Sequence, residues 1–258
     1  MDPNHIPAII YIVDNIVFED RKRRYSNALI VKILVVLQIY GISYGSSENF
    51  LRNHRDIMDA LEIHEIPNFR TLSRRARMID LRYINAMILG LISTERENAA
   101  IDSLIVNTCK QSTAMRRRIY GNYKDQQSTW GFSTKGWEYG RKVSISLDID
   151  STAIVEWEVT AASLYDKSTA FPLIDSVRDY SYVMMDAAYD SSDIYEYVYE
   201  NTQCTPLIDT NKRRGIVDSR LSHARREVIK LRIEEASRYP LRWGDRENVC
   251  NTRRHSGV

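Results

Sequence analysis

Apolar side chains recur at helical spacing through the first hundred residues. Ser26 or Asn27 can cap the first of these helices, and Gly41 lies where that helix would stop. Pro67 interrupts the pattern before another helix, which Asn68 or Thr71 can cap. The predicted helices span residues 27–38, 46–61, 68–77 and 81–92. The spacing therefore predicts an all-helical N-terminal region.

Short strands replace the helical spacing after residue 96. Residues 142–148 alternate polar and apolar side chains, and Asp150 and Ser151 make a tight turn into a hairpin partner. The polar and basic stretch over residues 110–137 is expected to be a loop or insertion. The predicted strands span residues 99–106, 142–148, 153–160, 182–186 and 204–208, and the predicted helices span residues 166–177, 192–199 and 219–237. This order predicts an α/β domain with a mixed sheet and flanking helices.

Two aspartates lie in strands that otherwise belong to a core. Asp102 is inside the apolar run 99–106, and Asp186 ends the run that begins at Tyr182. A buried carboxylate is costly unless a cation, a metal or hydrogen bonds neutralise it. Two such acids on neighbouring strands suit magnesium, which leaves positions for water and phosphate, so phosphodiester cleavage or transfer is the expected chemistry. Alternatively, either residue is a single core or strand-end aspartate with its hydrogen bonds satisfied.

The net charge of +2 over 258 residues implies no polyanionic partner by itself, but the cations are bunched. The basic clusters are Arg21–Arg24, Arg74–Arg77, Arg116–Arg118, Lys212–Arg214 and Arg225–Arg226. Such clusters suit phosphate contacts on particular faces, although solvated helix faces produce the same runs.

The helix predicted after Pro67 is basic, and with the helix before it resembles a helix-turn-helix. The residues expected to meet DNA on this helix are Arg70, Arg74, Arg75 and Arg77. Lys142, Arg213 and Arg214 are expected to offset substrate charge in the second region. Short helical pairs are also common in proteins that never bind DNA, so this pattern alone does not define the function.

Several other classes of protein are disfavoured. Three scattered cysteines without a C-x-x-C pair suggest neither a zinc site nor a disulfide framework, and a reducing cytoplasm is expected. Asp2 and Asp14 interrupt the apolar N-terminus, which argues against a signal peptide. The most apolar run, residues 28–39, is too short to span a bilayer, so no membrane partner is expected.

Four segments together resemble the insertion-sequence DDE transposases of prokaryotes. They are Ala100-Ile-Asp-Ser before a basic stretch, Gly140–Asp148 before a hairpin, Asp166 opening a helix, and Met185-Asp-Ala-Ala-Tyr-Asp-Ser191. The likeness covers essentially the whole chain, including Tyr25-Ser-Asn and Pro67-x-Phe-x-Thr-Leu-x-Arg74. Their order and spacing carry the resemblance, because no single motif is diagnostic.

The resemblance implies an RNase H-like catalytic core over residues 97–244 and a DNA-binding or dimerisation region over residues 1–96. It also implies that Asp102 and Asp186 are the first two ligands of a two-metal site for Mg²⁺ or Mn²⁺. Asp166 and Lys142 match positions of supporting character. The implied partner is double-stranded DNA, both transposon ends and target, bound by a homodimer in the cytoplasm and associated with the nucleoid.

The third acid departs from the family pattern, which is Tyr, two residues, Arg, three residues, Glu, six residues, Lys. Tyr239 and Arg242 fit, but Arg246 and Arg253 stand at the Glu and Lys positions. Glu247 comes one residue late, which is about 100° of rotation on a helix. Codons for these residues, read one base later, can restore a glutamate at position 246. We therefore expect a frameshift near residue 244 and an aberrant tail over residues 245–258.

The leading hypothesis is a DNA transposase that cleaves phosphodiester bonds and transfers strands at insertion-sequence ends, inactive if the third acid is missing. One alternative is a DNA-binding remnant without catalysis, and another is a nuclease or resolvase on the same fold.

Overall fold

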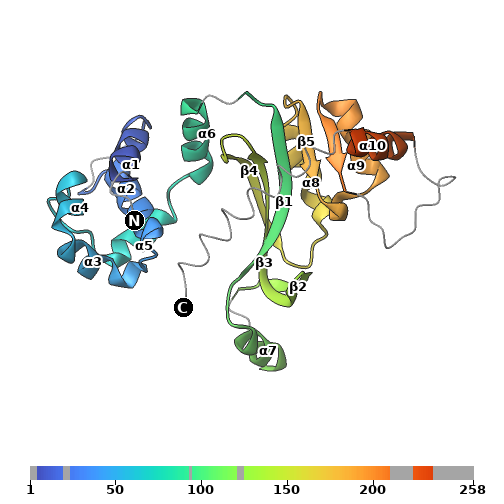
Figure 1. Cartoon of the computed structure of the whole chain (residues 1–258). Helices are drawn as coiled ribbons and strands as arrows, with labels where there is room; N and C mark the ends of the chain where they lie inside the picture. The colour runs from blue at the N-terminus through green and yellow to red at the C-terminus, as the bar shows by residue number, and fades with distance from the viewer. Residues whose placement is uncertain (1–4, 20–23, 93–94, 121–124, 210–222, 235–258) are drawn as a thin grey trace. The chain divides into compact units, whose positions relative to one another are not determined.

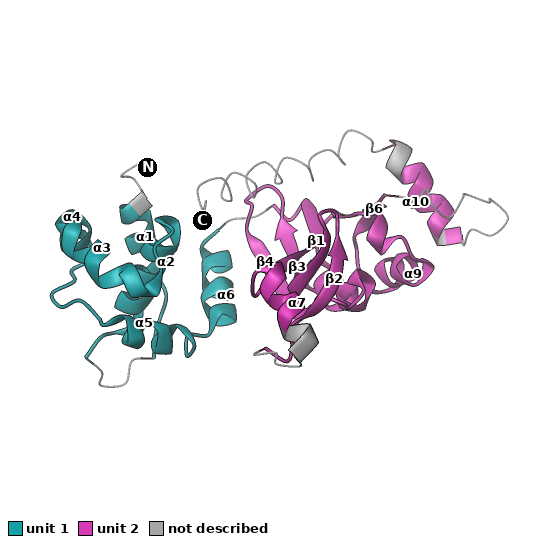
Figure 2. Cartoon of the chain, turned by 90° about the horizontal axis from the view of Figure 1, so that it is seen from below, with its two compact units in different colours: residues 1–93, 251–258 teal, residues 94–250 magenta. Residues whose placement is uncertain are grey.

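A computed structural model of the chain describes residues 5–19, 24–92, 95–120, 125–209 and 223–234. The chain divides into a helical unit within residues 1–93 and a sheet unit within residues 94–250 (Figure 2). Each unit has its own apolar core. Among the described helices, none is long and apolar enough to cross a membrane alone; only α2 and the following η1–α3 segment, bent by 106°, pass that test together.

The structure confirms the helices predicted over residues 27–38, 68–77 and 81–92, and it adds a helix near the N-terminus that was not predicted. Its elements are α1 (His5–Asp14), α2 (Asn27–Ile39), η1 (Tyr44–Ser46), α3 (Ser47–Asn53), α4 (Arg55–Ala60), α5 (Phe69–Ala76) and α6 (Leu81–Leu91). Ser26 caps α2 by accepting a hydrogen bond from the Leu29 amide, and Asn68 caps α5. Gly41 follows α2 with φ of +65°, a left-handed conformation that favours glycine after a helix.

The helix predicted over residues 46–61 is broken at His54 into α3 and α4. The His54 ring bonds the Phe50 carbonyl at 2.8 Å and stacks on the Phe50 ring, with 4.3 Å between centroids. This side chain takes the carbonyl that the His54 amide would reach in a continuous helix, and the backbone leaves the helical region at φ −122° and ψ 73°. A ring contact of this kind has no signature in the spacing of apolar residues.

The sheet confirms the predicted RNase H-like arrangement (Figure 1). Its strands are β1 (Asn98–Asn107), β2 (Thr129–Ser133), β3 (Gly136–Asp148), β4 (Ile154–Ala161), β5 (Tyr182–Met185) and β6 (Thr205–Ile208). β3 pairs antiparallel with β1, β2 and β4, whereas β5 runs parallel to both β1 and β6. The result is an antiparallel half followed by a parallel half, which puts β1 and β5 side by side.

The stretch over residues 110–137, predicted to be a loop or insertion, contains α7 (Gln111–Tyr120) and β2. The turn between β2 and β3 passes through Gly136 at φ of +98°, and Phe132 packs edge-on against Trp137 across the hairpin. Both aromatic side chains are exposed, and the one buried residue of β2 is Gly131, so the strand has no run of buried apolar side chains. The backbone of β2 is held as a strand by its antiparallel pairing with β3, which the composition of this segment does not predict.

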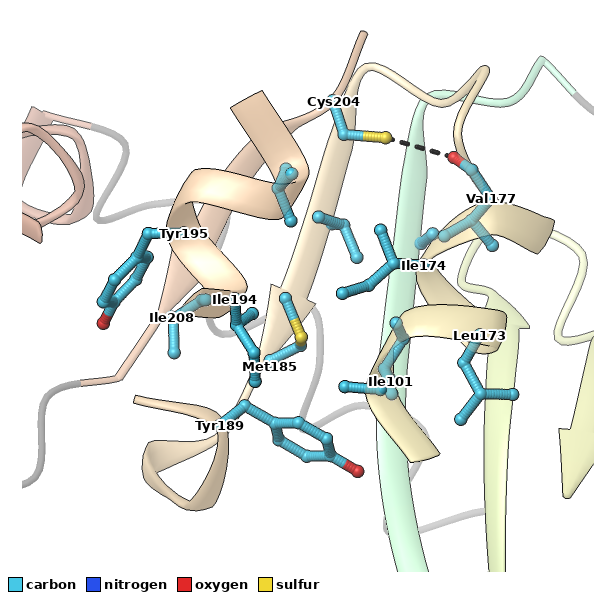
Figure 3. Close-up of a cluster of buried hydrophobic side chains, with 14 of the residues drawn as sticks. Ile101, Leu173, Ile174, Val177, Met185, Tyr189, Ile194, Tyr195, Cys204 and Ile208 are labelled. Carbon is cyan, nitrogen blue, oxygen red and sulfur yellow. Dashed lines mark hydrogen bonds between the residues drawn. The ribbon is translucent and has the colours of Figure 1, made fainter. Parts of the chain in front are cut away.

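Helices cover the sheet and follow its strands. They are η2 (Asp166–Thr169), α8 (Ala170–Ser176), η3 (Ala187–Tyr189), α9 (Ser192–Asn201) and α10 (His223–Glu234). Side chains of α8 and α9 form one buried cluster with Ile101 of β1 and Met185 of β5 (Figure 3). This cluster fixes one face of the two strands that carry the predicted acids.

Candidate active site

The pairing of β1 with β5 determines where the two aspartates lie. Ile101 of β1 is the parallel partner of Met185 of β5. Asp102 and Asp186 each follow one of these partners, on neighbouring segments whose backbones run about 4.8 Å apart. Ile101 and Met185 both point into the buried cluster. Because successive side chains of a strand alternate between faces, the two aspartates point toward the opposite face of the sheet. The topology thus brings together two acids that are far apart in the sequence.

Local hydrogen bonds orient both carboxylates. Asp102 Oδ1 accepts from the Ser103 amide at 2.8 Å. Asp186 Oδ1 accepts from the Ala188 amide at 2.9 Å and so caps η3, in an extended conformation that continues β5. Both residues are half-buried. Each carboxylate is therefore held on one side by its own backbone and lies near enough to the surface for a substrate to approach.

Behind this pair, on the face of the buried cluster, lies a polar network centred on Asp166. Ser103 donates to Asp166 Oδ1 at 2.5 Å, and Lys142 Nζ lies 2.9 Å from the same oxygen. Lys142 also donates to the Leu164 carbonyl. The network ties β1, β3 and the start of η2 together directly beside Asp102.

This placement corrects the prediction that Lys142 offsets substrate charge. Lys142 is only 8% exposed, and its ammonium group is engaged by Asp166 and by the Leu164 carbonyl. A buried lysine facing the interior from β3 pairs with the nearest acid because an unpaired charge there would be costly. Its sequence neighbours alternate as in any strand and do not reveal which face it occupies.

Tyr189 closes the same region from η3. The residue is 1% exposed, and its amide bonds the Asp186 carbonyl at 3.1 Å. Burial raises the pKa of Tyr189, and the three nearby acids, Asp166 most strongly, raise it further. The phenol therefore stays protonated and can act only as a neutral hydrogen-bonding group.

A separate ion pair joins α10 to the residue that follows η3. Asp190, whose side chain is 1% exposed, pairs with Arg225 of α10 and accepts from the Tyr195 hydroxyl at 2.6 Å. Arg225 belongs to one of the basic clusters expected to contact phosphate, but it is a mostly buried partner of Asp190. Burial raises the pKa of Tyr195, and the hydrogen bond to Asp190 raises it further. The Asp190–Arg225 pair thus anchors α10 beside η3.

In the helical unit, α5 exposes three of the four predicted DNA-contacting arginines, namely Arg70, Arg74 and Arg77 at its C-cap. The prediction fails for Arg75, which is 6% exposed and donates to the Tyr25 carbonyl and to Asn27. Its guanidinium thus provides hydrogen bonds to a carbonyl just before α2 and to the side chain of the first residue of α2. Helical spacing explains the difference, because Arg75 lies on the same face as the buried Leu72.

The remaining predicted site residues, Arg213, Arg214, Tyr239, Arg242 and Glu247, lie outside the described residues. Within the described ranges, no three His, Cys, Asp or Glu side chains form a group that could hold a metal ion. The pair Asp102 and Asp186 nevertheless fits a hard divalent cation, since magnesium often takes one or two carboxylates and completes its shell with water and phosphate.

Two residues of this region were not identified from the sequence as members of the site: Ser103 and Tyr189. They follow Asp102 and Asp186 at short distance, so proximity to each acid was the available signal. The acceptor of the Ser103 hydroxyl, Asp166, lies 63 residues further along the chain. Only the fold connects them.

A solved structure and a protein family are similar to this chain. A solved structure described as the cryo-EM structure of the piggyBac transposase synaptic complex with hairpin DNA is similar, with a TM-score of 0.42 and 12% identity. The similarity covers 86% of this chain and 54% of that chain, so this chain spans about half the length of that protein. No curated protein matches the sequence. The family model of the transposase DDE domain matches residues 93–245, more than half of the chain, and the chain therefore belongs to the DDE transposase family.

Proposed function

We propose that the chain acts on double-stranded DNA as a metal-dependent transposase, cleaving phosphodiester bonds at insertion-sequence ends and joining the ends to a target. The observation that carries the proposal is the register of β1 and β5, which sets Asp102 beside Asp186 in a domain of this family. Two adjacent carboxylates on one sheet face give the charge and the oxygen ligands that phosphoryl transfer requires.

Asp102 and Asp186 would hold Mg²⁺ or Mn²⁺. When bound, a divalent cation offsets the charge that develops on the phosphodiester oxygens. The protein contributes orientation: the Ser103 amide holds Asp102, and the Ala188 amide holds Asp186. Because these donors are backbone groups of rigid elements, the carboxylates need little reorganisation to bind.

The exposed arginines of α5 are proposed to contact DNA phosphates. Arg70, Arg74 and Arg77 are exposed within two turns of helix, and Arg70 lies 5.7 Å from the Phe69 ring centre. Cations spaced in this way neutralise phosphates without reading sequence, so they position the DNA. A second copy of the chain on the other transposon end would supply the paired geometry that end joining needs.

The test is cleavage of a labelled duplex carrying the element's own ends, with Mg²⁺ or Mn²⁺. Asp186→Asn removes one ligand. The matched control is Asp179→Asn, because Asp179 is an exposed acid that precedes the start of β5, whereas Asp186 follows its end. We expect cleavage and strand transfer by the unmodified chain and by the control, and neither by Asp186→Asn. Equal cleavage by all three proteins would contradict the proposed site.

A second candidate function, DNA binding without catalysis, is favoured by Arg246 at the place where the family pattern has its third acid. The same assay with Arg246→Glu separates the two. Activity that appears only in Arg246→Glu would identify the chain as a DNA-binding protein whose catalytic set is incomplete. Cleavage without joined products would instead indicate a nuclease.

A further inference from the structure

The Tyr189 side chain combines complete burial with an unused hydrogen-bonding group. Its ring belongs to the apolar cluster between the sheet and α8–α9, and the hydroxyl points away from that cluster, toward β1 (Figure 3). Among the described residues, the Tyr189 hydroxyl has no hydrogen bond of ordinary geometry. A buried donor without a partner is uncommon and costly, so its retention calls for a reason other than packing.

The surroundings of this hydroxyl are acidic and already connected to Asp102. Ser103 lies close enough to the phenol to counteract the upward shift of its pKa. The Ser103 hydroxyl uses its one proton on Asp166, so toward Tyr189 it can only accept. The Ser103 amide, meanwhile, holds the Asp102 carboxylate on the other face of the sheet. Ser103 thus joins the network behind the sheet to the acid in front.

We propose that Tyr189 is a positioning residue that acts on Asp102 through Ser103. Its hydroxyl donates to Ser103 Oγ when Asp102 holds a divalent cation, and this bond fixes the residue whose amide orients the carboxylate. The proposal rests on the metal-binding role proposed above for Asp102. Hydrogen-bonded partners of a ligating carboxylate orient it, and their loss typically costs about 10- to 100-fold in metal affinity.

Tyr195 supplies a matched control within the same cluster. It is fully buried, as Tyr189 is, but its hydroxyl is satisfied by Asp190, which pairs with Arg225 rather than with the Ser103 network. Phenylalanine at either position keeps the ring and removes only the hydroxyl. The two substitutions therefore separate an effect on the metal site from an effect on buried hydrogen bonding.

The test is Mn²⁺ affinity of the full chain, measured by electron paramagnetic resonance of free Mn²⁺, together with the melting temperature in the absence of metal. We expect Tyr189→Phe to weaken Mn²⁺ binding about tenfold while its metal-free melting temperature stays equal or rises. We expect Tyr195→Phe to lower the melting temperature and to leave Mn²⁺ affinity unchanged. Ser103→Ala should weaken binding too, and the double variant should be no weaker than the more affected single variant, because both act through one path.

Three results would overturn the proposal. If Tyr189→Phe binds Mn²⁺ within twofold of the unmodified chain, the hydroxyl has no positioning role, whereas the proposed function stands. If the losses from Tyr189→Phe and Ser103→Ala add in full, Tyr189 does not act through Ser103. If the unmodified chain shows no Mn²⁺ binding that Asp102→Asn removes, the metal site itself is wrong and the proposed function fails with it.

Discussion

The helical unit and the sheet unit differ in what they bury. Among the described residues, the helical unit buries two polar or charged residues, Ser47 and Arg75, in an otherwise apolar core. The sheet unit buries seven: Asn98, Ser128, Lys142, Ser144, Ser146, Asp148 and Thr169. Most polar groups in a protein interior are satisfied by hydrogen bonds or ion pairs. The proposed DNA contacts of the helical unit are therefore on its surface. The proposed site of the sheet unit is half-buried and is supported by polar groups in the interior, such as Lys142.

The same residue type consequently has different roles in the two units. Arg74 is exposed and can contact a phosphate, whereas Arg75 is buried and donates a hydrogen bond to the Tyr25 carbonyl. In the sheet unit, Lys142 neutralises the half-buried Asp166, and Arg225 neutralises the buried Asp190. A run of charged residues in the sequence does not show which of them are exposed and which neutralise groups in the interior. Substitutions can distinguish these two roles.

The largest effect is expected from the two aspartates of the site. Asp102→Asn and Asp186→Asn should each lower metal-dependent cleavage by on the order of 1000-fold, about 4 kcal/mol in the activation free energy. Because both would hold the same cation, the double variant should be little worse than either single variant. Cleavage rates at saturating Mn²⁺ measure this, and losses that multiply would argue against a shared site.

The next largest effect should come from the buried ion pair that fixes α10. Arg225→Met leaves Asp190 buried without its cation, so the free energy of unfolding should fall by about 3 kcal/mol. Urea unfolding measures the change. The control is Lys230→Met on the same helix, whose partner Glu227 is well exposed and whose loss should cost at most about 0.5 kcal/mol. Equal changes for both would mean that Asp190 needs no neutralisation.

A smaller effect should separate adjacent arginines of α5. Arg75→Met removes bonds to the Tyr25 carbonyl and Asn27 and should lower the free energy of unfolding by about 2 kcal/mol without changing DNA binding. Arg74→Met should leave unfolding nearly unchanged and reduce the slope of log affinity against log salt by about 1. Unfolding curves and salt titrations test the pair; exchanged outcomes would contradict the burial of Arg75.

The smallest effect is expected from the surface pair of Asp125 and Arg141 in the sheet unit. Two hydrogen bonds from Arg141, at 2.9 and 3.0 Å, hold the pKa of Asp125 well below its usual range. A depressed pKa stabilises the folded state above the unfolded pKa of about 3.9, and this stabilisation is lost as the pH falls through and below that value. The difference in melting temperature between the unmodified chain and Asp125→Asn should therefore shrink below about pH 4. A difference that is constant with pH would contradict the assignment.

Much of the fold could be predicted because periodicity and caps are local signals. Ser26, Asn68 and Gly41 mark helix ends in the structure as they do in the sequence, and the alternation over residues 142–148 falls within β3. The break at His54 and the strand β2 could not be predicted, because both depend on contacts that composition does not encode.

The site was predictable only in part for a related reason. Asp102 and Asp186 interrupt apolar runs, so each is conspicuous in the sequence. The burial of Lys142, Arg75 and Tyr189 depends on which face of an element each residue occupies after packing.

Iron-directed cleavage of the protein backbone tests the central claim, that Asp102 and Asp186 form one divalent-cation site. Fe²⁺ with ascorbate and hydrogen peroxide produces radicals that cut the chain near the bound ion. We expect cuts close to residue 102 and close to residue 186, both suppressed by excess Mg²⁺ and both lost in Asp102→Asn and in Asp186→Asn. Cuts at only one position, or cuts that survive either substitution, would contradict a shared site.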